Sequence, residues 1–150
     1  MTTSIHLCGP EDANALLAMV AQFHDEIGIE TTAEDREASV LPILEGTPLA
    51  VAYLFGPKNA PVGYLIISFG WSLELGGMDG FLDEIWIRPN VRKRGLAQEA
   101  LNSVIGALKG VGLKAIHLEV NRNDGATQSL YRRLGFQMRE KYALMTRVLS

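Results

Sequence analysis

Apolar positions near the N-terminus follow helical spacing. A short strand is predicted at Ser4–Leu7. The segment Gly9-Pro10-Glu11-Asp12 then has the features of a helix start, with proline in the first turn and acids at the positive end. Gly28 is placed to end this helix. Between this start and Gly28, apolar residues recur at helical spacing: Ala13, Leu16, Leu17, Val20, Phe23 and Ile27.

A second helix and a pair of strands come next. The segment Thr31-Thr32-Ala33-Glu34 has the pattern of a capping box. It predicts a helix that runs to about Glu45 and that Pro42 should kink or shorten. The apolar runs Leu49–Phe55 and Val62–Phe69 are separated by a turn rich in glycine and proline, so we expect them to form a hairpin.

The rest of the pattern alternates strands and helices. A strand at Phe81–Ile87 is closed by Pro89, which cannot donate to a β-ladder. The elements expected after it are a helix over Ala97–Leu108, a strand over Leu113–Val120, a helix over Ala126–Leu134, and strands near Phe136–Met138 and Tyr142–Val148. The order is therefore β-α-α-β-β-β-α-β-α-β-β. It predicts an α/β fold with a mixed sheet and helices on both faces.

Composition limits the class of protein. The chain has 150 residues, 47% of them hydrophobic, which suits one domain, 1–150, with one core. No apolar run approaches the roughly 20 residues that a membrane helix needs, and the first residues do not form a secretory signal. Cys8 is the only cysteine, and His6 and His117 lack partners at metal-ligand spacing. We therefore expect a cytoplasmic protein without a membrane span or a metal.

Charge is divided unevenly along the chain. Residues 1–84 hold 13 acids and 2 bases, a balance of −11, and residues 85–150 hold 4 acids and 12 bases, a balance of +8. Such asymmetry hints at two unlike ligands, one cationic and one anionic, although solvated surface charge could divide in this way by chance. Nucleic acid is disfavoured as the anion, because the basic half has no long Lys/Arg run and few aromatic side chains for stacking.

One junction carries most of the chemical information. The strand that ends at Ile87 leads into a basic loop, Arg92, Lys93 and Arg94, and Gly95 precedes the next helix. The exposed N–H groups and partial positive charge of a helix N-terminus bind phosphate, and glycine allows close backbone approach. The junction therefore predicts a pyrophosphate site without the glycine patterns of a Walker or dinucleotide loop. A basic turn that only caps a helix is the structural alternative.

Two motifs resemble the GCN5-related N-acetyltransferase (GNAT) family. Arg92-x-x-Gly95-x-Ala97, after a strand ending in Ile87-Arg88-Pro89, is similar to the acetyl-CoA motif of that family. Leu130-Tyr131-x-x-x-Gly135-Phe136 is similar to a second family signature at the expected distance. The resemblance covers the whole order of elements. It implies a GNAT-like acyl-CoA N-acyltransferase fold and an enzyme that moves the acetyl group of acetyl-CoA to an amine in a direct ternary complex.

The resemblance also implies which residues contact the cofactor. The pyrophosphate would lie against the basic loop and the first turn of the helix, and the pantetheine and thioester against a strand splayed from its neighbour. The residues implied are Ile85, Trp86, Ile87, Arg92, Lys93, Arg94, Gly95, Leu96, Ala97, Asn123 and Asp124. At Asp124 the family usually has asparagine, and a carboxylate would repel phosphate. Capping of the helix that starts at Ala126 is its structural alternative.

Three side chains are candidates for proton transfer. The resemblance places the Tyr131 hydroxyl near the sulfur of the leaving thiolate, whereas packing against Phe136 is the alternative. The acceptor ammonium must lose a proton before it attacks. Asp83 or Glu84 could remove it, and we favour Glu84. Alternation along a strand would place the two carboxylates on opposite faces.

The acceptor pocket is the least determined part. In the family the first two helices wall this pocket, so His24 and Glu26 could contact substrate, and Trp71 and Glu74 could line it from the loop before the fourth strand. A lone histidine on an amphipathic helix is more often a surface residue. The acceptor could be a small-molecule or peptide amine, and the acidic half favours a cationic one.

Other readings of the chain remain. A non-catalytic acyl-CoA-binding or sensor module would share the fold, and a CoA-independent anion-binding domain is disfavoured by both motifs. Homodimers are common in the family, and the sequence leaves a homodimer open without settling the oligomeric state.

Overall fold

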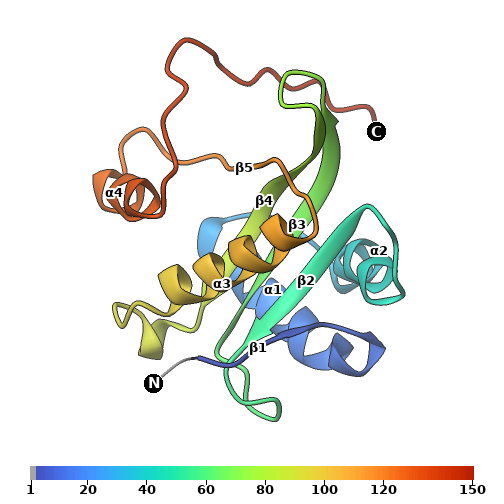
Figure 1. Ribbon diagram of the computed structural model, residues 1–150. Coiled ribbons are helices and arrows are strands. Elements are labelled where there is room, and N and C mark those ends of the chain that lie inside the picture. The colour runs from blue at the N-terminus through green and yellow to red at the C-terminus, as the bar shows by residue number, and fades with distance from the viewer. Residues whose placement is uncertain (1–2) are drawn as a thin grey trace. The chain divides into compact units, whose positions relative to one another are not determined.

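The computed structural model describes residues 3–150, which divide into two compact units after Glu119. The first contains a five-stranded sheet in the order β1-β2-β3-β4-β5 (Figure 1). Strands β1 to β4 are antiparallel neighbours, and β5 lies parallel to β4. The strands are β1 (Ile5–Leu7), β2 (Ala50–Phe55), β3 (Gly63–Ser72), β4 (Gly77–Ile87) and β5 (Ala115–His117).

Helices cover both faces of this sheet. Helices α1 (Ala13–Ile27) and α2 (Ala33–Leu44) lie on one face, and α3 (Leu96–Gly110) lies on the other (Figure 1). Two short 3-10 turns, η1 (Pro10–Asp12) and η2 (Pro89–Val91), precede α1 and α3. The predicted mixed sheet with helices on both faces is therefore confirmed.

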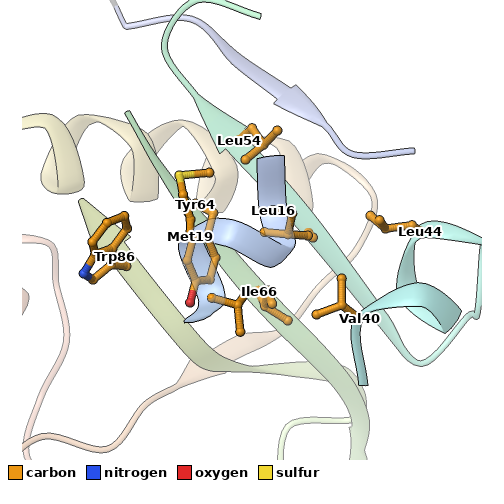
Figure 2. Packing of buried hydrophobic residues seen from close by; sticks show 10 residues of the cluster. Leu16, Met19, Val40, Leu44, Leu54, Tyr64, Ile66 and Trp86 are labelled. Atoms are coloured by element: carbon orange, nitrogen blue, oxygen red, sulfur yellow. The ribbon is translucent and has the colours of Figure 1, made fainter. Parts of the chain in front are cut away.

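The core on the α1 side is built by side chains that point the same way from neighbouring strands. Leu16 and Met19 of α1 are fully buried against Tyr64, Ile66 and Trp86 of the sheet (Figure 2). Burial of each such side chain contributes about 1.5–3 kcal/mol. Since the side chains of a strand alternate between faces, the buried Leu65 and Ile67 face α3 instead.

Gly63 lets β3 and β4 approach closely where the site begins. A Cβ added to Gly63 would lie 2.4 Å from the carbonyl oxygen of Trp86 and 2.8 Å from the Cδ1 of Ile87. Both neighbours belong to the end of β4 that leads into the basic loop. A side chain at this position would therefore push β4 out of its register with β3.

The start and the middle of α2 differ in detail from the prediction. The capping box lies one residue later than expected: Thr32 and Asp35 exchange hydrogen bonds of 2.8 and 3.1 Å. Asp35 is three residues after Thr32, and its carboxylate fills the role that the prediction gave to Glu34. The helix also continues through Pro42 to Leu44.

The second unit contains one helix, α4 (Gly125–Arg133), and a long C-terminal segment. The strands predicted near Phe136–Met138 and Tyr142–Val148 are wrong, because the described residues after His117 include no strand. The strand predicted over Leu113–Val120 is limited to β5. Apolar alternation alone does not make a strand, since the backbone also needs a neighbouring edge to pair with, and residues 136–150 have no ladder partner.

Candidate functional site

Strand β4 has one open edge where it approaches the basic loop. It pairs with β3 along its whole length but with β5 only over Asp79–Phe81. Beyond Phe81 the β5 side of β4 therefore has no strand neighbour among the described residues. The resemblance to the GNAT family implied a splayed edge beside Ile85–Ile87, and these residues lie in this unpaired part of β4.

Register determines which backbone groups face that edge. The N–H of Arg88 donates to the carbonyl of Val62 on the β3 side at 2.8 Å. Backbone groups of an antiparallel strand turn alternately to its two sides. Trp86 therefore faces β3 like Arg88, whereas Ile85 and Ile87 present their N–H groups to the open edge.

A β-bulge at Asp83 changes the relation between the two candidate bases. Ile66 is opposite Glu84 and Ile67 is opposite Leu82, which leaves Asp83 as the extra residue. The prediction that the two carboxylates lie on opposite faces of β4 assumed strict alternation of side chains. The bulge breaks that alternation.

The pKa of Asp83 is affected by the neighbouring charge of Glu84. Its side chain is exposed, yet partial desolvation raises its pKa, and the charges of Glu84 and Glu119 raise it further. His24 acts in the opposite direction. Asp83 therefore belongs to the same electrostatic cluster as Glu84.

Glu84 is held by two side chains from other elements. Its Oε2 lies 2.7 Å from the Nε2 of His24 on α1, and its Oε1 accepts a hydrogen bond of 2.8 Å from the hydroxyl of Tyr64 on β3. The side chains of His24 and Glu84 are only 13% and 17% exposed. The other ring nitrogen of His24, Nδ1, is 2.9 Å from the Oγ1 of Thr31, which also accepts from Arg36 at 3.1 Å. His24 is therefore part of a partly buried network that contains the favoured base.

Glu26, one helical turn after Phe23, joins α1 to the basic loop. Its carboxylate accepts two hydrogen bonds from the guanidinium of Arg92, at 2.6 and 2.8 Å, and one from the Nε1 of Trp86, at 2.7 Å. Arg92 also lies over the Trp86 ring, 5.8 Å from its centroid, and its Nε donates to the carbonyl of Ile87 at 2.8 Å. The hydrogen bonds from Arg92 and Trp86 lower the pKa of Glu26 to about 2.

The basic loop then turns into α3 through two left-handed residues. Lys93 has φ of +64° and Gly95, which caps the helix, has φ of +78°. The first intrahelical hydrogen bond runs from the N–H of Glu99 to the carbonyl of Gly95, at 3.0 Å. The N–H groups of Leu96 and Ala97 therefore have no partner within the helix and point out of its N-terminus. Arg92 is paired with Glu26, so within residues 3–150 the basic side chains of this loop that form no ion pair are those of Lys93 and Arg94.

The second unit contains the other predicted cofactor and catalytic residues. Asp124 caps α4: its carboxylate accepts from the N–H of Thr127 at 3.0 Å and from its hydroxyl at 2.7 Å. These hydrogen bonds lower the pKa of Asp124, so the structural alternative for Asp124 is confirmed. Asn123 lies just before it and donates its N–H to the side chain of Asn121 at 2.8 Å.

Tyr131 lies on α4 and packs edge-on against Phe136, with 5.7 Å between the ring centroids. The predicted packing contact is therefore present. Burial, and secondarily the charge of Asp124, raise the pKa of Tyr131. A phenol in this environment stays protonated and can donate a proton.

Two predicted pocket residues lie apart from the Glu84 network. Trp71 is 71% exposed and pairs with Met78 near the tip of the β3–β4 hairpin, and Glu74 is in the turn between the strands. Along β3, Trp71 is five residues beyond Ile66, the partner of Glu84, or roughly 17 Å at the rise of a strand. The structure therefore does not bring them to the two candidate bases.

Sequence reasoning missed Tyr64 and Thr31 as members of the site. Tyr64 lies within an apolar strand, where its pattern is that of a core aromatic, and Thr31 was assigned only to helix capping. Among residues 3–150, no group of three or more histidine, cysteine or acidic side chains is placed to hold a metal ion. No helix in the same range is long and apolar enough to cross a bilayer.

The fold is that of an acetyltransferase family. The family model for the acetyltransferase (GNAT) family matches residues 16–136. The chain belongs to this family, which confirms the family and fold that the two motifs predicted. No curated protein matches the chain by sequence.

Solved structures agree with the fold. An integron cassette protein, HFX_CASS3, from the mobile metagenome of Cole Harbour Salt Marsh is 26% identical with a TM-score of 0.85, covering 97% of this chain and 90% of that one. AAC(6')-Iy in complex with the bisubstrate analogue CoA-S-monomethyl-acetylneamine is 14% identical, with a TM-score of 0.81 and coverage of 99% and 100%. The ribosomal-protein-alanine N-acetyltransferase of Brucella melitensis biovar Abortus 2308 is 16% identical, with a TM-score of 0.75 and coverage of 100% and 99%.

Proposed function

We propose that this protein is an acetyl-CoA-dependent N-acetyltransferase that acts by direct attack of an amine on the thioester. The observation that carries the proposal is the open edge of β4, which leads through the basic loop to the unpartnered N–H groups at the start of α3. A pyrophosphate would bind the N–H groups of Arg94 to Ala97, with Lys93 and Arg94 supplying full charges. Family membership supports acyl-CoA as the donor.

The thioester would lie along the open edge of β4. When the amine attacks, the carbonyl oxygen gains negative charge, and an N–H group of Ile85 or Ile87 could donate to it without reorganisation. Trp86 would serve this region by its packing, since its own backbone groups face β3. These assignments follow from the alternation of backbone groups along β4.

Glu84 would remove the proton that an ammonium must lose before it can attack. The freed amine then forms the C–N bond, and the C–S bond breaks. The departing thiolate would take its proton from the hydroxyl of Tyr131, which solvent later restores. Asp83, in the same electrostatic cluster, would help to attract a cationic acceptor. We propose a small-molecule amine as the acceptor, which is consistent with the acetylneamine portion of the analogue bound by AAC(6')-Iy.

Thiol release tests this function. The protein is incubated with acetyl-CoA and matched cationic and neutral amines at low and roughly 1 M salt, since screening weakens attraction between charges. We expect turnover with cationic amines, weaker at high salt. Preference for neutral amines would reject the cationic acceptor, and binding of acetyl-CoA without turnover by any amine would favour the binding-module alternative.

Calorimetry tests the placement of the pyrophosphate. Gly95→Ala and Gly95→Glu share the strain of a side chain at φ +78°, which is about 1 kcal/mol, and nothing lies within 4 Å of an added Cβ. Only glutamate adds negative charge and reach. We expect Gly95→Glu to weaken CoA binding at least about tenfold relative to Gly95→Ala, because the carboxylate repels phosphate. Equal affinities in the two folded variants would refute this placement.

A further inference from the structure

The carboxylate of Glu84 is not a solitary base. Both of its oxygens have protein partners, and these come from different elements: His24 from α1 and Tyr64 from β3. Burial, and then the neighbouring charge of Glu84, raise the pKa of Tyr64, so its hydroxyl remains a hydrogen-bond donor. An ionised carboxylate can accept both hydrogen bonds, whereas a protonated one must give up an acceptor position.

We propose that His24 is a positioning residue that, held in turn by Thr31, orients the carboxylate of Glu84 toward the acceptor amine. The inference rests on the proposed function, in which Glu84 takes the proton from the acceptor ammonium.

Thr31 allows His24 to keep both ring hydrogen bonds in either charge state. In the neutral imidazole, Nε2–H donates to Glu84 and Nδ1 accepts from the hydroxyl of Thr31. In the imidazolium, Nδ1–H donates to the same oxygen, because a hydroxyl can serve as donor or acceptor. The donor to Glu84 is therefore present in both states, and only the charge beside the carboxylate changes.

Orientation matters because a base must lie within hydrogen-bonding reach of the proton that it removes. His24 holds Oε2 of Glu84 and Tyr64 holds Oε1, so rotation of the carboxylate away from this position would break a hydrogen bond at each oxygen.

Substitution by glutamine separates this role from a purely structural one. His24→Gln can keep a donor to Glu84, whereas His24→Ala cannot. His24→Ala should lose about tenfold in kcat/KM, mainly in kcat, with His24→Gln restoring most of it.

A second histidine provides the matched control. His6 on β1 also contacts a carboxylate, that of Asp12, at 3.3 Å, but it is outside the proposed machinery. His6→Ala should leave kcat/KM unchanged. A folded His24→Ala variant with full kcat/KM, or a loss that His24→Gln does not restore, would overturn the proposal.

An NMR spectrum tests the contact without turnover. The imidazole N–H signals of His24 are compared in the wild type and in Glu84→Ala, where loss of the acceptor should shift the signal of the Nε2–H proton. Unchanged signals overturn the proposal. If the signal moves but no amine supports thiol release, the contact stands and the proposed function fails, so the two failures are distinguishable.

Discussion

The contact between Glu26 and Arg92 gives a stability prediction that can be worked from the structure. Glu26→Gln keeps an oxygen that can accept from Trp86 and removes the charge that holds both guanidinium nitrogens of Arg92. The change is nearly equal in volume, so packing should be preserved. The change in the free energy of unfolding caused by Glu26→Gln therefore measures the contribution of the ion pair that attaches the basic loop to α1.

The pKa of Glu26 sets the upper bound of this effect. It falls from the ordinary value of 4.5 to about 2, and one pKa unit corresponds to about 1.4 kcal/mol, which gives about 3 kcal/mol without screening. The side chains of Arg92 and Glu26 are 36% and 39% exposed, however, and exposed pairs are strongly screened. We therefore expect Glu26→Gln to lower the free energy of unfolding by about 1 kcal/mol at pH 7.

The sign of the pH dependence follows from linkage. A carboxyl group with a lower pKa in the folded state stabilises the protein fully above its unfolded value of 4.5, and this stabilisation is lost as pH falls toward about 2. The difference between wild type and Glu26→Gln should accordingly be largest at pH 7 and smaller at pH 4. It should also decrease at 1 M salt.

Urea unfolding at pH 7 and pH 4, at low and high salt, measures these differences. A double-mutant cycle with Arg92→Met isolates the pair, and its coupling energy should be about 1 kcal/mol. If the cycle shows no coupling at low salt, the ion pair does not attach the loop to α1. A difference that grows on acidification would contradict the linkage reasoning.

Two further predictions concern the second unit and the core. Tyr131→Phe should lower kcat about tenfold or more with little change in KM or in unfolding, because its hydroxyl acts mainly as charge develops on sulfur; full activity in steady-state kinetics would assign Tyr131 to packing on Phe136. Leu16→Ala, at a fully buried position, should destabilise the fold by about 2–5 kcal/mol in urea unfolding. Leu73→Ala, at a side chain that is 91% exposed, should change it by less than about 0.5 kcal/mol, and similar losses for both would contradict the burial assignment.

Local signals explain what the sequence determined by itself. Three features are short-range: the proline and acids of η1 directly before α1, the left-handed Gly28 at the end of α1, and Gly95 before α3. The two glycines lie where the pattern placed them, whereas the proline and acids form a 3-10 turn and not the first turn of α1. The junction between β4, the basic loop and α3 also lies where the pattern placed it. Because these features depend on neighbours within a few residues, the family motif and the geometry of this junction could be predicted from the chain alone.

Pairing between distant segments was decided only in three dimensions. The sequence could not show that Asp83 is a bulged residue, since a bulge is defined by the register against β3. Neither could it place His24 on Glu84, 60 residues away, or show that Glu26 occupies the guanidinium of Arg92. The predicted C-terminal strands failed for the same reason, because a strand requires an edge that its own residues do not supply. Side-chain type and spacing describe what a segment can do, whereas the register of the sheet and the packing of α1 determine which distant groups come within hydrogen-bonding distance.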